Sequence, residues 1–242
     1  MVWFRDGRAG GQNARTRTVS GENMGEFFSL LTRWLPMLMN GAVTTASLCI
    51  IAIVAGFFVG VVIYLMENGR SSIVCRVARV YISLFRGTPV IAQVLLCYYL
   101  PGELGLSLPG YLAAVIALTL NTAAYQSQIL RSGFQAIAPG QLEAASICGL
   151  TPRQALWHIQ IPQVLRLTLP SLISELIDVI KASAVVSVIA ITDLMRVGQQ
   201  LASSTYRPLE VYIAIALSYL VLTSLLSLLG SYAERRWQKE GQ

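Results

Sequence analysis

Long apolar segments, separated by short polar loops, are the feature that most constrains how this sequence can fold. The first runs over residues 35–66, and its second half is almost wholly apolar. About 20 apolar residues are enough to cross the hydrocarbon core of a bilayer. Charged side chains make up only 12% of the chain, against about 25% in a typical soluble domain. The sequence therefore predicts an all-α integral membrane protein.

The apolar segments predict a bundle of about five transmembrane helices within residues 27–237, preceded by a short interfacial helix over residues 27–34. The expected spans cover residues 35–66, a second segment that ends near residue 100, and residues 110–136, 164–191 and 209–232. A chain of 242 residues leaves no room for a sizeable soluble domain beside this bundle.

Lys and Arg are distributed unequally between the two sides of the expected bundle. An N-terminus outside the membrane leaves Arg196 and Arg207 in the structured external loops. The cytoplasmic set is then Arg70, Arg76, Arg79, Arg86, Arg131, Arg153, Arg166, Arg235, Arg236 and Lys239. Cytoplasmic loops carry the excess of positive charge in membrane proteins. We therefore expect a multi-pass protein with its N-terminus outside and a cytoplasmic C-terminal tail at residues 238–242.

Residues 1–26 are polar and arginine-rich and lack an apolar core, so they do not have the features of a secretory signal peptide. Their positive charge conflicts with an external position. We expect either a disordered tail or the product of an upstream start, with Met24 as the natural first residue.

Residues 86–89, which are Arg86, Gly87, Thr88 and Pro89, interrupt the second expected span. Gly87 loosens a helix, Thr88 can cap one, and Pro89 suits the first turn of a new one. The apolar residues that follow would extend only about 16 Å, which is too short to cross a bilayer, so the span must begin before Arg86. A broken membrane helix is tolerated where protein or water satisfies its backbone, often beside a transport path.

Two of the expected spans carry polar side chains at membrane depth. They are Asn121, Thr122, Tyr125 and Gln128 in the third span, and Glu175, Asp178 and Lys181 in the fourth. At 100° per residue, Glu175, Asp178 and Lys181 share one wedge of a helix. A carboxylate near the bilayer centre costs at least about 2.5 kcal/mol, so such groups usually face a cavity or a partner. Asp178 and Lys181 can pair within the helix, which leaves Glu175 as an unpaired acid facing the interior.

Between the third and fourth spans, a polar segment at residues 139–163 predicts two short helices. The residues before Gly149 are good helix formers, and Gly149 can end that helix in a left-handed conformation. Thr151 and Pro152 can start a second, amphipathic helix, which we expect to end before Pro162. A hairpin this short cannot bury its own apolar face. From the residues alone, it is either a docking element or an ordinary connection between two membrane helices.

This segment resembles the EAA loop of the membrane-spanning permease subunits of bacterial ABC importers. The residues on the fixed positions of that motif are Glu143, Ala144, Ala145 and Gly149, with Ile161 and Pro162 as its closing pair. Family members usually have Leu where Ile161 stands here, between an Ile and the Pro, so the match is not complete. Two further strings, FRGTP at residues 85–89 and NTAAY at residues 121–125, are similar to those of the branch that imports polar amino acids. The resemblance extends over residues 35–237.

The resemblance implies that the EAA loop docks on a separate ABC ATPase subunit, which holds ATP and Mg²⁺. It also implies a bacterial inner membrane, a second permease subunit, identical or related, and an external solute-binding protein. Glu175 falls on an acid that is implicated in holding the ligand in the amino-acid branch. Ala182 stands where an Asp is usual, and Gln128 where a Glu is common, which speaks against a strongly cationic substrate. The expected substrate is an amino acid or a related small polar solute, moved by alternating access.

A secondary transporter or channel for a small polar solute is the alternative, although coupling to an ion gradient gives no reason for a docking hairpin. A membrane-embedded enzyme is not supported, because the chain has no H-E-x-x-H or G-x-S-x-G motif. It also lacks the phosphate-binding G-x-x-x-x-G-K-[ST], so a partner must hydrolyse ATP. The cysteines have no C-x-x-C spacing and His158 has no second histidine, so no metal site is predicted. We expect no cofactor on this chain and no nucleic-acid partner.

Overall fold

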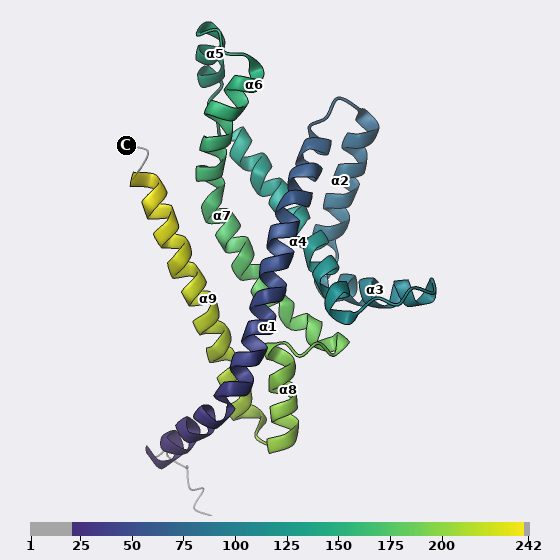
Figure 1. Cartoon of the computed structure of the whole chain (residues 1–242), viewed down its shortest axis with the longest axis vertical. Helices are drawn as coiled ribbons and strands as arrows, with labels where there is room; N and C mark the ends of the chain where they lie inside the picture. Colours follow the sequence, from purple (N-terminus) through teal and green to yellow (C-terminus); the bar gives the residue numbers. More distant parts are fainter. Residues whose placement is uncertain (1–20, 240–242) are drawn as a thin grey trace, which may run out of the picture. The chain divides into compact units, whose positions relative to one another are not determined.

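The computed structural model describes residues 21–239, with side chains for residues 29–232 and 234–236. Every regular element in this part of the chain is a helix (Figure 1). The predicted all-α class is therefore confirmed for the described residues. The remainder of the chain, including most of the expected N-terminal tail, lies outside the described residues.

The first helix, α1 (Gly21–Glu67), is continuous through Pro36. It therefore includes the end of the expected polar tail, and the separate interfacial helix expected over residues 27–34 is not formed. A proline removes only one backbone donor, which a long helix can absorb when its neighbouring turns stay bonded. The chain divides into two compact units, Met1–Pro36 and Met37–Gln242. All of the candidate site residues belong to the second unit.

Two helices joined at a sharp bend follow α1. The first, α2 (Ser72–Gly87), packs Ala78 and Ile82 against Ile63 of α1. The second, α3 (Val90–Glu103), leaves α2 at 109° and projects sideways from the other helices (Figure 1). The break falls at Thr88 and Pro89, whose backbones are both extended. The ring of Pro89 clashes with Thr88 in the helical conformation, so Thr88 cannot easily continue α2. The interruption predicted at residues 86–89 is confirmed.

The helix α4 (Gly110–Gln135) packs against α2, α3 and α7 (Ile161–Ala182). Glycines allow the closest approaches. A Cβ on Gly56 of α1 would lie 2.4 Å from the side chain of Thr122, and one on Gly133 would lie 2.3 Å from that of Thr168 in α7. Small residues at such crossings let membrane helices pack backbone to backbone. These contacts place α4 between α1 and α7.

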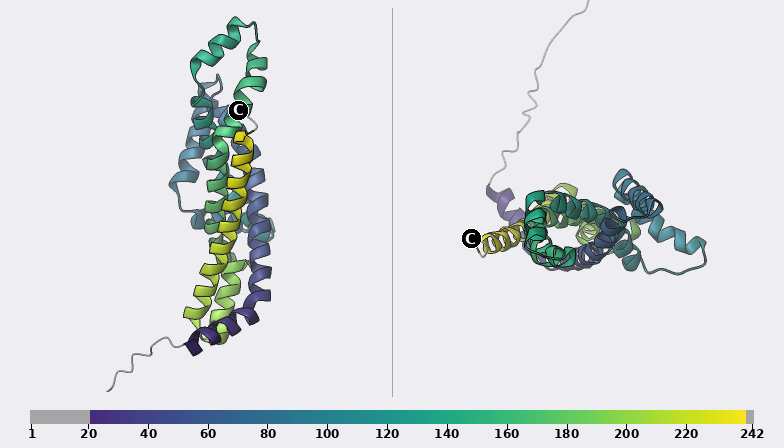
Figure 2. Two further views of the ribbon diagram at one scale, coloured as in Figure 1. Left: turned by 90° about the vertical axis from the view of Figure 1, so that its left-hand side faces the viewer. Right: turned by 90° about the horizontal axis from the view of Figure 1, so that it is seen from above.

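The segment between α4 and α7 contains α5 (Pro139–Ile147), α6 (Pro152–Ala155) and η1 (Leu156–Gln160), a single π turn. Figure 2 shows α5 and α6 projecting beyond the end of α7. After α7, the chain continues as η2 (Ser183–Ile189), a 3₁₀ helix, and not as the α-helix expected to residue 191.

The last two helices are α8 (Leu194–Thr205) and α9 (Pro208–Lys239). Asp193 begins α8, because its Oδ1 accepts a 2.9 Å hydrogen bond from the backbone N–H of Arg196. α8 packs on α9, where Gly198 lies against the side chain of Ile215. The segment expected as the last span, residues 209–232, lies within α9.

Two helices within residues 21–239 are long and apolar enough to cross a membrane, namely Ser29–Glu67 and Pro208–Arg236. The bent pair α2 and α3 would make a third if it counts as one span. α4 and α7 fall short by composition, because residues such as Gln126 and Glu175 lower their hydropathy. Length and composition alone therefore do not establish the predicted five spans.

Candidate functional site

The carboxylate of Glu175 in α7 is held by a side chain of α4. The hydroxyl of Thr122 donates a 2.7 Å hydrogen bond to Glu175 Oε1 and accepts one of 3.1 Å from Gln126 Nε2. Gln126 Nε2 also donates to the backbone carbonyl of Ile53 in α1, at 3.0 Å. Thr122 and Gln126 are both buried. One chain of hydrogen bonds thus links three helices and ends on an acid.

A second polar network closes the bend between α2 and α3. Gln93 in α3 donates to the carbonyl of Phe85 at 2.9 Å and to the hydroxyl of Thr88 at 2.8 Å. Asn121 of α4 donates to Gln93 Oε1 at 2.9 Å and to Phe85 O at 3.2 Å. These amides satisfy backbone carbonyls that the break leaves free. Gln93 was not among the predicted site residues, although a glutamine inside an apolar stretch directly after a broken helix is a signal for this role.

Arg86, near the end of α2, lies over the ring of Tyr125, with its guanidinium carbon 5.2 Å from the ring centroid. This is a cation–π arrangement. Arg86 is exposed and Tyr125 is half-buried. Three of the predicted polar residues of α4, Asn121, Thr122 and Tyr125, thus lie between the helix break and Glu175.

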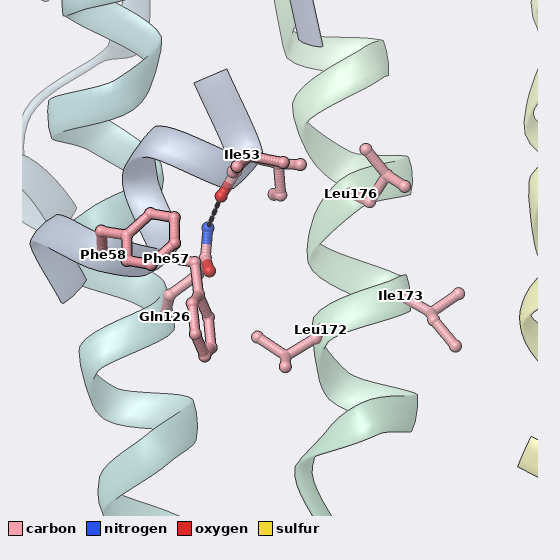
Figure 3. A pocket seen from close by; sticks show the side chains of 8 residues that line it. Ile53, Phe57, Phe58, Gln126, Leu172, Ile173 and Leu176 are labelled. Atoms are coloured by element: carbon pink, nitrogen blue, oxygen red, sulfur yellow. Dashed lines mark hydrogen bonds between the residues drawn. The ribbon is translucent and has the colours of Figure 1, made fainter. Parts of the chain in front are cut away.

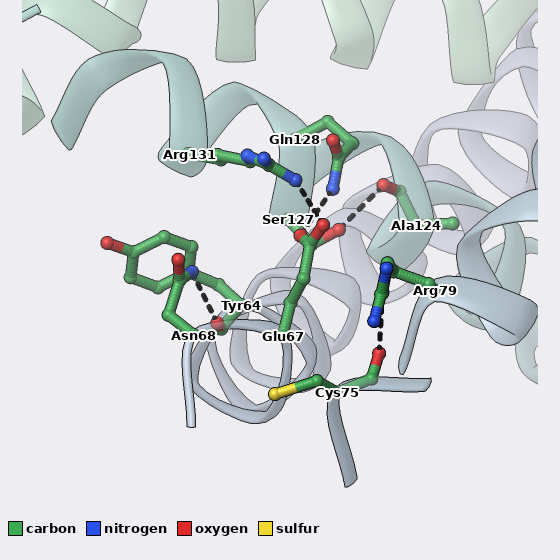
Figure 4. Close-up of polar contacts among 9 residues, drawn as sticks. All are labelled: Tyr64, Glu67, Asn68, Cys75, Arg79, Ala124, Ser127, Gln128 and Arg131. Atoms are coloured by element: carbon green, nitrogen blue, oxygen red, sulfur yellow. Dashed lines mark hydrogen bonds and ion pairs between the residues drawn. The ribbon is translucent and has the colours of Figure 1, made fainter. Parts of the chain in front are cut away.

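Gln128 contacts a different acid. Its amide donates to Glu67 Oε2 at 3.0 Å, and Arg131 forms an ion pair with Glu67 Oε1. Figure 4 shows the two side chains of α4 reaching the carboxylate together, at the end of α1. The Glu67 side chain is only 6% exposed. Gln128 therefore belongs to this cluster and not to the Glu175 network, and Glu67 was not among the predicted site residues.

Asp178 and Lys181 form the intrahelical ion pair that the sequence predicts, with Oδ1 and Nζ 2.7 Å apart. The Lys181 side chain is 58% exposed and that of Asp178 is 65% exposed. Glu175, by contrast, is half-buried. The pair thus points outward from this chain, whereas Glu175 is tied to α4.

An apolar groove with a volume of about 310 Å³ lies between α1, α4 and α7. Phe57 and Phe58 line it from α1, and Leu172 and Ile173 line it from α7 (Figure 3). Gln126 supplies a polar side chain on its wall, where Figure 3 shows the hydrogen bond to Ile53. The groove therefore borders the hydrogen-bond chain that reaches Glu175.

The segment predicted to dock on a partner has well-defined turns. Gly149 adopts φ +78°, which is the left-handed conformation expected for it. Thr151 and Gln154 form a reciprocal capping box, with Pro152 in the first turn of α6. Glu143 and Ala144 on α5 are exposed, and Ala145 is buried. Two exposed apolar side chains that sequence reasoning missed, Ile147 and Trp157, are 87% and 66% exposed.

The expectation that the second short helix ends before Pro162 is wrong. α6, η1 and α7 follow one another without a gap, so Ile161 and Pro162 lie at the start of α7. In the π turn, the N–H of Ile161 bonds back to the carbonyl of Leu156, five residues earlier. This wider turn shifts the hydrogen-bond register directly before a residue that has no N–H to donate. The helix can therefore continue through the proline.

Comparison with known proteins identifies the family. Residues 52–239 match the family model described as binding-protein-dependent transport system inner membrane component. The arginine transport system permease protein ArtQ of Bacillus subtilis is 35% identical over 210 residues, which cover 86% of this chain and 96% of that protein. The nopaline transport system permease protein NocM of Agrobacterium fabrum is 34% identical over 215 residues, which cover 85% and 89% of the two chains.

Solved structures agree with this assignment. A chain from the crystal structure of an amino acid ABC transporter with histidines has a TM-score of 0.81 and 40% identity, over 87% of this chain and 98% of that chain. A chain of the MetNI methionine ABC transporter in an inward-facing conformation shares the fold, with a TM-score of 0.70 at 21% identity, over 85% of this chain and 98% of that one. As a permease subunit, this chain is a membrane protein and not itself an enzyme. It belongs to the binding-protein-dependent transport system inner membrane components, among the amino-acid ABC transporter permeases.

Proposed function

We propose that this chain translocates an amino acid or a related small polar solute by alternating access, as a permease subunit of an ATP-driven importer. The observation that carries the proposal is the carboxylate of Glu175, held by the hydroxyl of Thr122 at 2.7 Å inside the bundle. An ionisable group among membrane helices is costly and marks a substrate or ion path by default. A carboxylate can form a charge-assisted hydrogen bond with the α-ammonium group of an amino acid.

The helix break beside this acid supports a transport path. Asn121 and Gln93 satisfy the backbone at the bend, so the broken segment remains ordered without continuous helix. Broken helices near the membrane midplane form substrate sites in many transporters. Relatives of this chain are named for arginine, glutamine and nopaline transport, all of which carry an α-amino acid unit. Glu175 as the ligand acid is part of the proposal.

Coupling to ATP hydrolysis is proposed to run through residues 139–163. The exposed Ile147 and Trp157 give α5 and η1 an apolar surface beside the polar Glu143. Exposed large apolar side chains on a projecting hairpin are typical of a protein interface. The proposed occupant is a separate ABC ATPase subunit that carries ATP and Mg²⁺.

A second permease subunit and an external solute-binding protein complete the proposed importer, with the N-terminus of this chain outside and its C-terminus in the cytoplasm. The five spans that the sequence predicts would be too few for a path with a gate on each side, which is why we include a second permease in the proposal. The charge distribution supports the orientation. The alternative, a secondary transporter or channel, would need no such hairpin surface.

The test is reconstitution of this permease with a candidate ABC ATPase and a solute-binding protein from the same organism in lipid vesicles. ATP hydrolysis and uptake of radiolabelled amino acids are measured together. We expect uptake that requires ATP and the binding protein. Uptake driven by an ion gradient in the absence of ATP would instead establish the secondary transporter.

A further inference from the structure

The helix α2 carries an apolar stripe that no other part of the described chain covers. Its opposite side holds Ala78 and Ile82, which pack on Ile63 of α1. The side chains of the stripe are between 54% and 72% exposed, and they are those of Ile73, Val77, Val80 and Leu84. Residues at these spacings share one face of a helix. Because α1 beside it is long and apolar enough to cross a membrane, the stripe lies where lipid chains can contact it.

Exposed arginines flank the stripe along one side. Arg76 follows Ile73 by three residues, and Arg79 follows Arg76 by three, so they are neighbours on the helix surface. Residues 68–87 contain four arginines and no Asp or Glu. Neither Arg76 nor Arg79 forms an ion pair with a described residue. Arg79 uses its Nε to donate a 3.3 Å hydrogen bond to the carbonyl of Cys75, which leaves its other N–H donors available.

The position of these arginines along α2 suits contact with lipid headgroups. α1 ends at Glu67 and α2 begins at Ser72, so both helices reach the same end of the bundle. Arg76 and Arg79 lie about 6 and 10 Å from the start of α2 at 1.5 Å per residue. An arginine side chain can lay its methylene groups on apolar surface and extend its guanidinium to the headgroups. In the proposed orientation, this end faces the cytoplasmic leaflet, whose surface is negative.

We propose that this face of α2 binds an anionic phospholipid, with Arg76 and Arg79 on its phosphate and the stripe against its acyl chains. Charge complementarity selects this occupant. Two unpaired cations without a nearby acid attract an anionic headgroup, whereas the cation of a zwitterionic headgroup offsets that attraction. The guanidinium fork also matches the geometry of phosphate oxygens. The inference goes beyond the proposed function, because it concerns a lipid site on the outside of this chain.

The experiment measures which phospholipid remains bound to the full-length chain. The chain is purified in detergent and mixed with equal amounts of phosphatidylglycerol and phosphatidylcholine that have the same acyl chains. Native mass spectrometry then counts each lipid on single chains and on dimers separately. We expect the parent to prefer phosphatidylglycerol, and we expect that preference to fall as the ionic strength rises, because salt screens exposed charges.

Arg76→Gln combined with Arg79→Gln should lower the preference roughly 25-fold, at about fivefold for each arginine near a charged lipid. Arg76→Lys combined with Arg79→Lys keeps both charges and should retain most of the preference. The matched control is Arg153→Gln combined with Arg166→Gln, which removes two exposed arginines from α6 and α7 and should leave the preference unchanged. If the first double variant does not fold, the single changes Arg76→Gln and Arg79→Gln take its place, each with a fivefold expected loss.

Equal binding of both lipids by the parent would overturn the inference. So would an unchanged preference after the Gln substitutions on α2, or an equal loss in the control on α6 and α7, since that loss would come from net charge alone. A preference found on single chains but lost in dimers would show that another permease covers this face, and it would overturn the lipid as occupant. None of these outcomes bears on the proposed transport function, which the uptake assay tests.

Discussion

Glu67, the last residue of α1, is joined to Arg131 of α4 by an ion pair whose carboxylate is almost fully buried. The amide of Gln128 donates a hydrogen bond to the other carboxylate oxygen, so both oxygens of Glu67 have a partner (Figure 4). Removing one partner of a buried pair leaves the other uncompensated, whereas a complete pair adds little net stability. This contact therefore fixes how the ends of two helices meet.

Glu67→Gln should lower the free energy of unfolding by about 1 to 3 kcal/mol, because Arg131 loses its charged partner. The loss stays in this range because the Arg131 side chain is 40% exposed and water can solvate it. Thermal unfolding in detergent measures the effect. The double variant Glu67→Gln with Arg131→Gln should recover part of the loss, which a double-mutant cycle would show as a coupling energy. Additive effects of the two changes would contradict the ion pair as the cause.

Glu175→Gln keeps the shape of the side chain and removes its charge. A hydrogen bond to a charged group is worth about 1.5 to 3 kcal/mol, so uptake at low substrate concentration should fall roughly ten- to hundredfold. Assembly and basal ATP hydrolysis should survive, because Gln can still accept the hydrogen bond from Thr122. Substrate-dependent ATP hydrolysis and uptake in reconstituted vesicles provide the measurement.

Asp178→Asn serves as the matched control for that prediction. It removes a carboxylate from the same helix but leaves Lys181 without its partner. We expect mainly a lower yield of membrane-inserted protein, because an unpaired ammonium is costly in a bilayer. If Glu175→Gln transported like the parent and lowered only the yield, Glu175 would be a structural acid and the proposed ligand site would be wrong.

Glu143→Lys and Gly149→Val should uncouple transport from ATP hydrolysis while leaving membrane insertion intact. The first reverses a charge on the exposed face of α5. The second places a β-branched residue at φ +78°, where such residues are strongly disfavoured. Gly149→Asn is the control, because Asn tolerates the left-handed conformation. The measurements are co-purification of the ATPase subunit and uptake, and normal values in both variants would show that the loop is only a connection.

We expect the stability of the fold around α8 to depend on pH through Asp193, which begins that helix. Burial raises the pKa of its carboxyl above the ordinary value, so the folded state favours the protonated form. At low pH the carboxyl is protonated in both states, and its burial costs little. As pH rises from about 4, the ordinary Asp pKa, through the raised pKa of the folded state, the contribution of Asp193 to the free energy of unfolding falls. Asp193→Asn keeps a good N-cap without the charge and should flatten that dependence.

Asp193→Ala removes the cap as well and should cost about 0.5 to 2 kcal/mol at every pH. Thermal unfolding of the parent and both variants across the acid range separates the two effects. An identical pH dependence in the parent and in Asp193→Asn would show that this carboxyl does not contribute.

The elements that local chemistry dictates were predictable. The break at residues 86–89 follows from Gly87 and Pro89, which lie two positions apart. The turn at Gly149 follows from a glycine placed between the end of one helix and the N-cap of the next. The pair of Asp178 with Lys181 follows from helical spacing alone. The family assignment likewise depended on short ordered strings, which need no tertiary information.

The contacts between distant residues were not predictable in the same way. Gln128 was assigned to the path with the other polar residues of its helix, yet its amide donates a hydrogen bond to Glu67 of α1. The role of Gln93 depends on a 109° bend whose angle no propensity specifies. The continuation of the helix through Pro162 required a π turn, which arises from competition among backbone hydrogen bonds and leaves no distinct residue pattern.

That continuous run of helix from α6 through η1 into α7 has a mechanical consequence. Trp157, at the exposed end, and Glu175, inside the bundle, are carried by one helical rod, about 27 Å apart along its axis at 1.5 Å per residue. The helix between them is continuous but contains the π turn, Pro162 and Pro170, so the proposed docking of the hairpin would act on the same helix that carries Glu175. The π turn at Leu156–Gln160 contains Trp157, so the proposed docking surface includes the one stretch of this helix whose hydrogen-bond register is already shifted.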